Sequence, residues 1–343
     1  MIDIEDIVRP NILTLKAYSS ARDEFSGSEG IFLDANENPY GNLNRYPDPH
    51  QKTLKQKLAA LKNVTTEQIF IGNGSDEVID LAFRIFCTPG KDKALTFTPT
   101  YGMYEVAAAT NDIQLVKIPL NENFQIDLHE TEQYLADPAI KLLFICSPNN
   151  PTGNLLHSDD LHALLNPFKG TVIIDEAYID FRLSTSWVSN IEQYSNLSVS
   201  QTFSKAWGLA AARVGVAYAN DSIIQFFNKV KPPYNISQLN QEAAIHALDN
   251  IPQYKINLKQ ILNEKQQLQQ ALNELKMVKK IHPSDANFLL IEVADASDLY
   301  NTLVEQQIII RNRHNIIDNC IRITVGTPQE NAALIHALRR YPK

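Results

Sequence analysis

Short apolar runs alternate with helix-forming patterns along the chain from about residue 67 onward. The runs are β-branched and apolar on both faces, as strands buried between two helix layers are. The segment "SDEVIDLAFRIFC" (75–87) has helical spacing with Ser75 as the expected N-cap, and 101–110 predicts another helix. We expect strands at 93–97, 113–118, 140–146, 171–175, 198–203 and 214–219. Strands that alternate with helices predict an α/β domain with a mostly parallel sheet.

A second, smaller unit is expected after a long polar helix pattern at 254–275. Its pattern predicts strands at 287–293, 308–311 and 321–326, and helices near 296–306 and from about 328. This mixture indicates a small α+β domain. The first forty or so residues have little periodicity, and we expect them to pack against this unit. The predicted domains are therefore 40–255 for the large one, and 1–39 with 256–343 for the small one.

Composition and charge exclude several classes of protein. The chain of 343 residues is long enough for two domains, and its formal charge of −8 without a basic block argues against nucleic acid or membrane partners. The N-terminus lacks a signal-peptide pattern, and no apolar run reaches the roughly 18 residues that span a bilayer. Three widely separated cysteines favour a reduced, cytoplasmic protein, and the absence of CxxC and HExxH motifs predicts no metal site.

Polar residues follow several predicted strands, at the sheet edge where ligands of α/β proteins bind. They are Asn150 in "SPNNPTG", Asp175 and Tyr178 in "IIDEAY", Ser204 and Lys205 in "SKAW", and the "NGSD" loop at 73–76. Taken singly, Asp175 is equally well explained as a cap, whereas Tyr178 is better explained as a core residue and Lys205 as a surface lysine. When polar residues follow four strands whose ends meet at one edge of the sheet, a shared binding site explains them better than exposure to solvent does. The loop completes neither the dinucleotide fingerprint nor a P-loop.

Several segments resemble one enzyme family. "SPNNPTG", "DEAYIDF" and "SKAWGLAAARVG" are similar to the signature segments of fold-type I pyridoxal-phosphate aminotransferases. "LDANENPYG", "NRYPDP", "GNGSDE", "PTYGMY" and "RITVGT" resemble the histidinol-phosphate aminotransferase family, in order and along nearly the whole chain. The spacings fit too, with 25 residues from Asn150 to Asp175, 30 from Asp175 to Lys205 and eight from Lys205 to Arg213. The resemblance implies the fold-type I architecture, a large α/β domain with a small α+β domain.

The resemblance also implies a cofactor, pyridoxal 5′-phosphate. Lys205 would hold it as a Schiff base and move the substrate's Cα proton, which requires a lowered lysine pKa. Asp175 would keep the cofactor's ring nitrogen protonated, so that the ring acts as an electron sink. Tyr178 and Asn150 would hydrogen-bond the ring's 3′ oxygen, and Tyr101 would stack on its face.

The cofactor's phosphate needs amide donors and positive charge. Ser75 and Asp76 begin a helix whose N–H groups and dipole suit an anion. Ser204 would add a hydroxyl group, and Arg213 would add a positively charged guanidinium group. By resemblance, Tyr46 would reach this phosphate from the other subunit. The implied enzyme is a homodimer with shared active sites.

Arginines of the small unit are the expected substrate contacts. By resemblance, Arg322 would grip the α-carboxylate of glutamate, and the same fork would serve the phosphate ester of histidinol phosphate. Arg311 would be a second phosphate contact and Tyr18 a third, and Asn36 would line the same pocket. The resemblance assigns no role to Arg313.

The expected function is therefore transamination between L-histidinol phosphate and 2-oxoglutarate in histidine biosynthesis, giving 3-(imidazol-4-yl)-2-oxopropyl phosphate and L-glutamate. Two alternatives share the fold, a threonine-phosphate decarboxylase and an aromatic-amino-acid aminotransferase. A cofactor-binding regulatory protein without turnover is disfavoured by the intact lysine, aspartate and tyrosine. A nicotinamide-dependent dehydrogenase is disfavoured by the incomplete glycine fingerprint.

Overall fold

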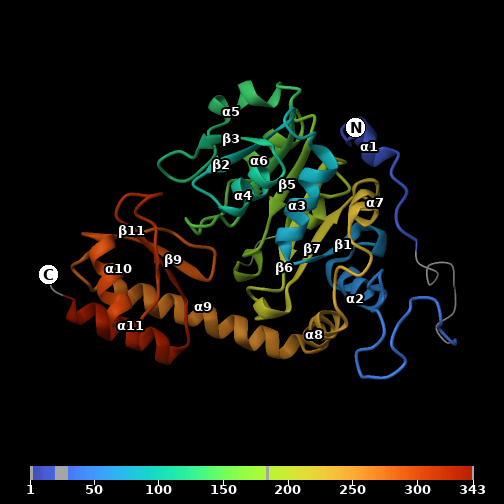
Figure 1. Cartoon of the computed structure of the whole chain (residues 1–343). Helices are drawn as coiled ribbons and strands as arrows, with labels where there is room; N and C mark the ends of the chain where they lie inside the picture. The colour runs from blue at the N-terminus through green and yellow to red at the C-terminus, as the bar shows by residue number, and fades with distance from the viewer. Residues whose placement is uncertain (1–2, 20–29, 183–184, 342–343) are drawn as a thin grey trace.

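A seven-stranded sheet forms the centre of the larger part of the protein (Figure 1). The computed structural model describes residues 3–19, 30–182 and 185–341. In spatial order the strands are β1 (Ile69–Asn73), β7 (Val214–Ala219), β6 (Leu197–Thr202), β5 (Thr171–Asp175), β4 (Ile140–Cys146), β2 (Lys93–Thr98) and β3 (Gln114–Pro119). Strand β7 pairs antiparallel with β1 and β6, and the other pairs are parallel. The predicted α/β class and its mostly parallel sheet are confirmed.

Helices cover both faces of this sheet, which explains why its strands are apolar on both sides. One face carries α3 (Ser75–Phe86), α4 (Met103–Thr110) and α7 (Asp221–Val230), and the other α2 (Lys52–Lys62), α5 (Leu128–Leu135), α6 (Ser158–Leu165) and α8 (Gln238–Asp249). Successive strand residues point to opposite faces. In β4, Phe144 packs with the first group, and Leu143 and Ile145 pack with the second.

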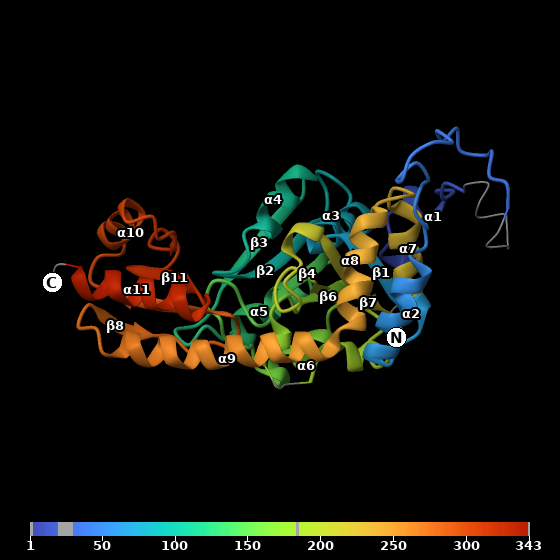
Figure 2. The same cartoon turned by 90° about the horizontal axis from the view of Figure 1, so that it is seen from below.

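The smaller part is a four-stranded antiparallel sheet with helices on one face. Its order is β10 (Arg311–Asn312), β11 (Cys320–Thr324), β9 (Phe288–Val293) and β8 (Val278–Ile281). The helices are α10 (Ala296–Glu305), α11 (Pro328–Arg340) and the end of α9 (Ile251–Asn273), which runs from the large part to the small one (Figure 2). Because α9 is continuous, the boundary at residue 255 stays a prediction.

Two details of the small part differ from expectation. The strand predicted at 308–311 is wrong except at its last residue, since β10 begins at Arg311. Ile308 and Ile310 instead pack against the edge of the core without strand pairing. Strand β8 was not predicted, because its sequence "VKKI" is too short and too polar to stand out.

The N-terminal segment packs against the large sheet, so the prediction that it belongs with the small unit is wrong over residues 4–13. Ile4, Ile7 and Ile12 join the core formed by α3 and α7. The backbone N–H of Arg9 donates to the carbonyl of Ile85 at 2.9 Å. Helix α1 (Pro10–Leu13) accordingly lies next to α7, far from the C-terminal helices (Figure 1).

Candidate active site

One cavity gathers most of the predicted site residues. It has a volume of about 640 Å³ and lies beyond the carboxyl ends of β4, β5 and β6, against the open face of the small sheet. Eleven of the predicted residues line it: Ser75, Asp76, Tyr101, Asn150, Asp175, Tyr178, Ser204, Lys205, Arg213, Arg311 and Arg322. The strand ends therefore converge as the sequence predicts.

Three predicted residues lie elsewhere in this chain. Asn36 and Tyr46 line a different hollow, where the Tyr46 ring stacks on Tyr234 at 4.4 Å between centroids. Tyr18 is 71 % exposed and does not line the cavity. Tyr18 and Asn36 therefore do not line the cavity of their own chain, and the N-terminal segments that carry them lie at the end of the large part far from the small sheet (Figure 2).

Asp175 is the buried acid of the cavity. It ends β5 and is 2 % exposed. Its Oδ2 accepts a hydrogen bond from the hydroxyl of Tyr104 at 2.8 Å, and its Oδ1 accepts one from the backbone N–H of Ala177 at 3.1 Å. Burial raises the pKa of Asp175 to about 6, because the charged form loses its water, and both hydrogen bonds act in the opposite direction. The site therefore holds a carboxylate that needs a positive partner.

Lys205 lies across the same cavity on the turn after β6. Its side chain is exposed to the cavity, with its Nζ 5.7 Å from the centre of the Tyr178 ring. Burial is the largest cause that lowers the pKa of this lysine, and the Arg322 cation adds to the effect. The negative charge of Asp175 acts in the opposite direction and raises the pKa of Lys205. A lysine with a lowered pKa in a cavity is the form that reacts as a nucleophile and exchanges protons.

Asn150 links the two sides of the cavity. Its amide nitrogen donates to the hydroxyl of Tyr178 at 3.3 Å, and its amide oxygen accepts from the guanidinium of Arg322. Tyr178 is buried, and burial raises the pKa of its hydroxyl well above the ordinary value. Arg322 also lies over the ring of Phe288, at 5.1 Å from the centroid. A hydroxyl and an amide thus stand side by side as hydrogen-bonding groups between Lys205 and the small sheet.

The amino end of α3 forms an open cradle. Its N-cap is Gly74 rather than Ser75, so the predicted cap is wrong by one residue, and Gly74 has no side chain with which to cap the first turn. Gly74 has a φ of +81°, and a Cβ there would lie 2.6 Å from the guanidinium of Arg213. Ser204 lies nearby on the turn after β6, with its backbone N–H bonded to Thr202 Oγ1 at 3.1 Å. Backbone N–H groups, a hydroxyl and a guanidinium around a space that a side chain would fill suit a phosphate group.

Tyr104 is a site residue that the sequence analysis did not single out. It is fully buried, stacks on Phe144 at 5.0 Å and meets Tyr101 edge-on at 5.7 Å. The Tyr101 hydroxyl donates to Asp76 at 3.1 Å. The spacing of the two tyrosines in "PTYGMY" is the available signal, because residues three apart lie on one side of a helix start. Tyr104 therefore holds the Asp175 carboxylate in place through its hydroxyl, from the core rather than from the cavity.

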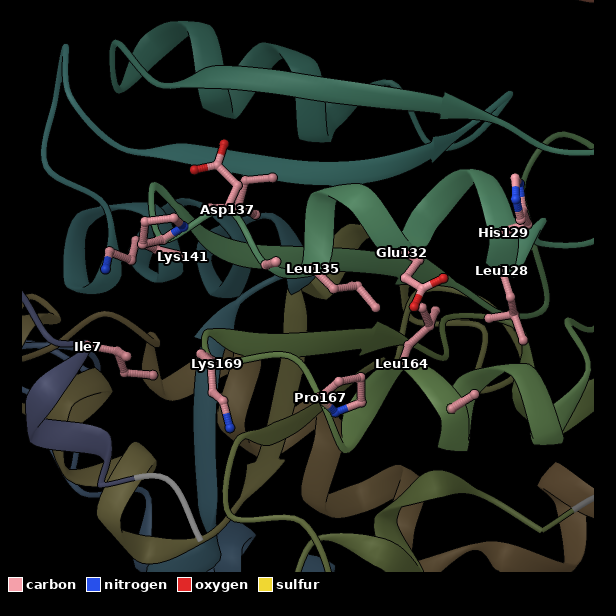
Figure 3. Close-up of a pocket in the computed structure, with 14 residues that line it drawn as sticks. Ile7, Leu128, His129, Glu132, Leu135, Asp137, Lys141, Leu164, Pro167 and Lys169 are labelled. Atoms are coloured by element: carbon pink, nitrogen blue, oxygen red, sulfur yellow. The ribbon is translucent and has the colours of Figure 1, made fainter.

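A second cavity, of about 790 Å³, lies at the opposite end of the strands (Figure 3). It lies between α5 and α6, with Lys141 and Lys169 at one end and Leu128 and His129 at the other. Its walls are mainly apolar, and its charged groups lie at the rim without converging on a point. Although larger, it lacks the polar constellation of the first cavity, which we take as the active site.

The comparisons with known proteins agree with this site. The model of the family "Aminotransferase class I and II" matches residues 29–338. A protein from Cytophaga hutchinsonii named histidinol-phosphate aminotransferase is 50 % identical, over 98 % of this chain and 99 % of its own length. One of the same name from Parabacteroides distasonis is 49 % identical over 99 % of both. The chain therefore belongs to the class I and II aminotransferases, and within them to the histidinol-phosphate aminotransferase family.

Solved structures show the same architecture. The histidinol-phosphate aminotransferase from Clostridium acetobutylicum superposes with a TM-score of 0.80 at 28 % identity, over 87 % of this chain and 90 % of that one. An L-threonine-O-3-phosphate decarboxylase from Porphyromonas gingivalis superposes with a TM-score of 0.73 at 26 % identity, over 87 % and 91 %. Since aminotransferases and decarboxylases both have this fold, the fold alone does not distinguish the two activities.

The chain has no helix, among its described residues, that is long and apolar enough to cross a membrane. Its described part also brings together no group of three histidine, cysteine or acidic side chains that would hold a metal ion.

Proposed function

We propose that this cavity binds pyridoxal 5′-phosphate and that the chain is a histidinol-phosphate transaminase. The observation that carries the proposal is the convergence of Lys205, Asp175 and the open end of α3 in one cavity. When bound, the cofactor supplies an electron sink for the carbon that loses its proton. The donor set fits it, with an amine for the aldehyde, a buried carboxylate for the ring nitrogen and a cradle for the phosphate.

Each proposed cofactor contact follows from the chemistry of its residue. Lys205 would hold the aldehyde carbon until the substrate's amino group displaces it, and the freed amine would then move a proton from the substrate's Cα to that aldehyde carbon. Asp175, held by Tyr104, keeps a proton on the ring nitrogen through its negative charge. Tyr178 and Asn150 bind the ring's 3′ oxygen, and Tyr101 covers one face of the ring.

The phosphate contacts complete the proposed cofactor site. The N–H groups of Ser75 and Asp76 point from the start of α3, and Ser204 and Arg213 add a hydroxyl and a guanidinium. The Asp76 carboxylate accepts hydrogen bonds from Tyr101 and Arg213, at 3.1 and 3.2 Å. These partners satisfy the carboxylate, and the backbone N–H of Asp76 is the proposed donor to the phosphate.

The proposed substrates are L-histidinol phosphate and 2-oxoglutarate, with L-glutamate as the second product. Support comes from relatives of that name at about half identity over the whole chain, and from arginines at the substrate end of the cavity. One anion-binding place then serves a phosphate ester in one half of the reaction and a carboxylate in the other.

A substrate panel tests the proposal. The purified protein, loaded with pyridoxal 5′-phosphate, is given L-histidinol phosphate, L-threonine phosphate or L-phenylalanine, each with 2-oxoglutarate. We expect glutamate to form fastest with L-histidinol phosphate. Carbon dioxide released from L-threonine phosphate, without glutamate formation, would make the chain a decarboxylase instead. Fastest glutamate formation with L-phenylalanine would make it an aromatic aminotransferase.

Arg322→Ala is expected to slow both halves of the reaction, each by about 10- to 100-fold in kcat/KM. The reason is that one guanidinium binds the anion of either substrate, and a charge-assisted contact is lost in both cases. Single-turnover rates with L-histidinol phosphate and with glutamate measure the two halves separately. Arg322→Lys serves as control, because it keeps the charge but not the planar fork. A loss confined to glutamate contradicts a shared anion site.

We further propose a homodimer in which Tyr46 completes the neighbour's cofactor site, with Tyr18 and Asn36 near the neighbour's substrate. Tyr46 is 49 % exposed and lies outside its own chain's cavity. The segment around it is also exposed at Ile31 and Leu33, by 92 % and 89 %. Apolar side chains in such a run are typical of a surface that another chain covers.

Mixed dimers test the shared site. Tyr46→Phe removes one hydroxyl contact to the phosphate and is expected to weaken cofactor binding by tenfold or more. Lys205→Ala chains mixed with Tyr46→Phe chains at limiting cofactor are then expected to regain about one quarter of wild-type activity, because each mixed dimer holds one intact site. The unmixed variants are the controls. Activity no higher than the average of those controls would show that Tyr46 serves its own chain or none.

A further inference from the structure

A third arginine lies at the substrate end of the cavity. Arg313 lines it together with Arg311 and Arg322. Its Nε is shielded from solvent and has no hydrogen-bond partner, and the same holds for the Nε of Arg322. A buried donor without a partner is costly, so two such donors at one end of a cavity point to a ligand that binds them.

The small sheet explains how the three arginines come together. Arg311 on β10 pairs directly with Arg322 on β11. Arg313 follows Arg311 by two residues, and its backbone N–H donates to the carbonyl of Cys320 at 2.9 Å. Residues two apart on extended chain share a face, so all three side chains leave the same side of the sheet. Ile321 and Ile323 fill the opposite side with the helices.

The positive charge at this place is not balanced within the described residues. Burial is the largest cause that lowers the pKa of Arg313, to about 10, and the Arg322 and Arg311 cations add to it. The Tyr178 hydroxyl acts in the opposite direction, and no carboxylate contributes. The acids that line the cavity, Asp76 and Asp175, lie at the strand ends of the large sheet instead. Like charges directly opposite on paired strands are destabilising unless an anion joins them.

We propose that Arg313, with Arg311 and Arg322, forms a three-arginine site that selects a doubly charged phosphate ester over a carboxylate. This inference rests on the proposed function and assigns to Arg313 the recognition of the substrate's second negative charge. Two guanidinium forks satisfy a carboxylate, whereas a phosphate monoester has three acceptor oxygens and a charge near −2 at neutral pH. The guanidinium of Arg313 therefore adds more to the binding of a phosphate ester than to the binding of a carboxylic acid.

Two ligands that cannot react test this selection, because they lack the amino group. They are 2-(imidazol-4-yl)ethyl phosphate and 3-(imidazol-4-yl)propanoate, and their dissociation constants from the cofactor-loaded enzyme are measured by calorimetry. Arg313→Gln is expected to weaken binding of the ester by tenfold or more and binding of the acid by threefold at most. Arg313→Lys should fall between Arg313→Gln and wild type. Arg339→Gln is the control, since Arg339 pairs with Glu274 at 3.2 Å and lines no part of the cavity.

The pH dependence separates selection from a structural effect. The ester gains its second charge near pH 6, so wild type should bind it more tightly as the pH rises from about 5.5 to 7.5. Arg313→Gln should reduce this rise. Besides Arg311, Arg322 and Tyr178, the titratable neighbours are His314, paired with Asp318 at 3.2 Å, and Lys205 across the cavity. Both ligands carry an imidazole whose charge also changes in this range. The acid ligand, whose carboxylate stays ionised, therefore reports every pH effect except that of the phosphate.

Each outcome is decisive. Equal weakening of ester and acid, or an unchanged pH slope, would overturn the role of Arg313 while wild-type turnover of L-histidinol phosphate still supports the proposed function. A loss confined to the acid would reassign Arg313 to glutamate. A wild type that neither turns over L-histidinol phosphate nor prefers the ester would overturn the proposed function itself.

Discussion

Lys205→Ala is expected to lower kcat by about 10⁴-fold and to leave a folded protein. The loss lies at the upper end for a proton-transfer group, because the same amine also holds the cofactor. Its Nζ faces the cavity, so the change leaves the cores of both sheets intact. Turnover of L-histidinol phosphate measures the first effect, and thermal unfolding measures the second.

A matched lysine controls for charge and exposure. Lys169 is exposed at the rim of the second cavity, and Lys169→Ala is expected to keep wild-type turnover (Figure 3). Borohydride reduction of the loaded wild type, followed by peptide mass analysis, should place the cofactor's mass on Lys205. Turnover of Lys205→Ala close to wild type, or the mass on another lysine, would contradict the proposed role.

Asp175→Asn is expected to slow turnover by about 10²–10³-fold, the range found when one preorganised electrostatic contact is lost. The amide keeps the size of the side chain and still accepts from Tyr104, but it lacks the charge that holds a proton on the ring nitrogen. Replacing the cofactor by its 1-deaza analogue, which has no ring nitrogen, should slow wild type strongly and the variant little. Equal slowing of both would show that Asp175 acts in another way.

The same substitution is expected to stabilise the cofactor-free protein. The pKa of Asp175 is raised from 3.8 to about 6 by folding, so the folded state binds more protons between these values. The free energy of unfolding then falls as the pH rises from about 4 to 6, by roughly 3 kcal/mol for a shift of this size. Asp175→Asn should remove this fall and be more stable at pH 7. Identical pH profiles of unfolding would show that Asp175 is not strained without cofactor.

The sequence predicted the large sheet well for a physical reason. Its central strands are covered on both faces, so most of them are short runs of apolar, often β-branched residues, although β6 ("LSVSQT") also buries polar side chains. The polar residue that follows such a run lies at a ligand-binding edge, which is why Asp175 and Lys205 were predictable. Tyr104 was not predicted, because a buried hydroxyl and a core tyrosine have the same sequence pattern.

Other features depend on contacts that no local pattern encodes. Residues 4–13 pack on α3 and α7, which are separated from them by some seventy to two hundred residues. The Arg311 and Arg322 pairing requires the register of two short strands joined by a turn. Tyr18, Asn36 and Tyr46 require a second chain if they have the proposed roles, and one chain's sequence does not specify how a partner lies.

The central claim is that Lys205 carries pyridoxal 5′-phosphate and that L-histidinol phosphate is the amino donor. The most direct test is the absorption spectrum of the loaded protein before and after addition of L-histidinol phosphate without any oxo acid. We predict a visible band that is lost as the cofactor takes up the amino group, and that returns when 2-oxoglutarate is added. A visible band that L-histidinol phosphate leaves unchanged would contradict the substrate, and the failure of any band to form with added cofactor would contradict the site.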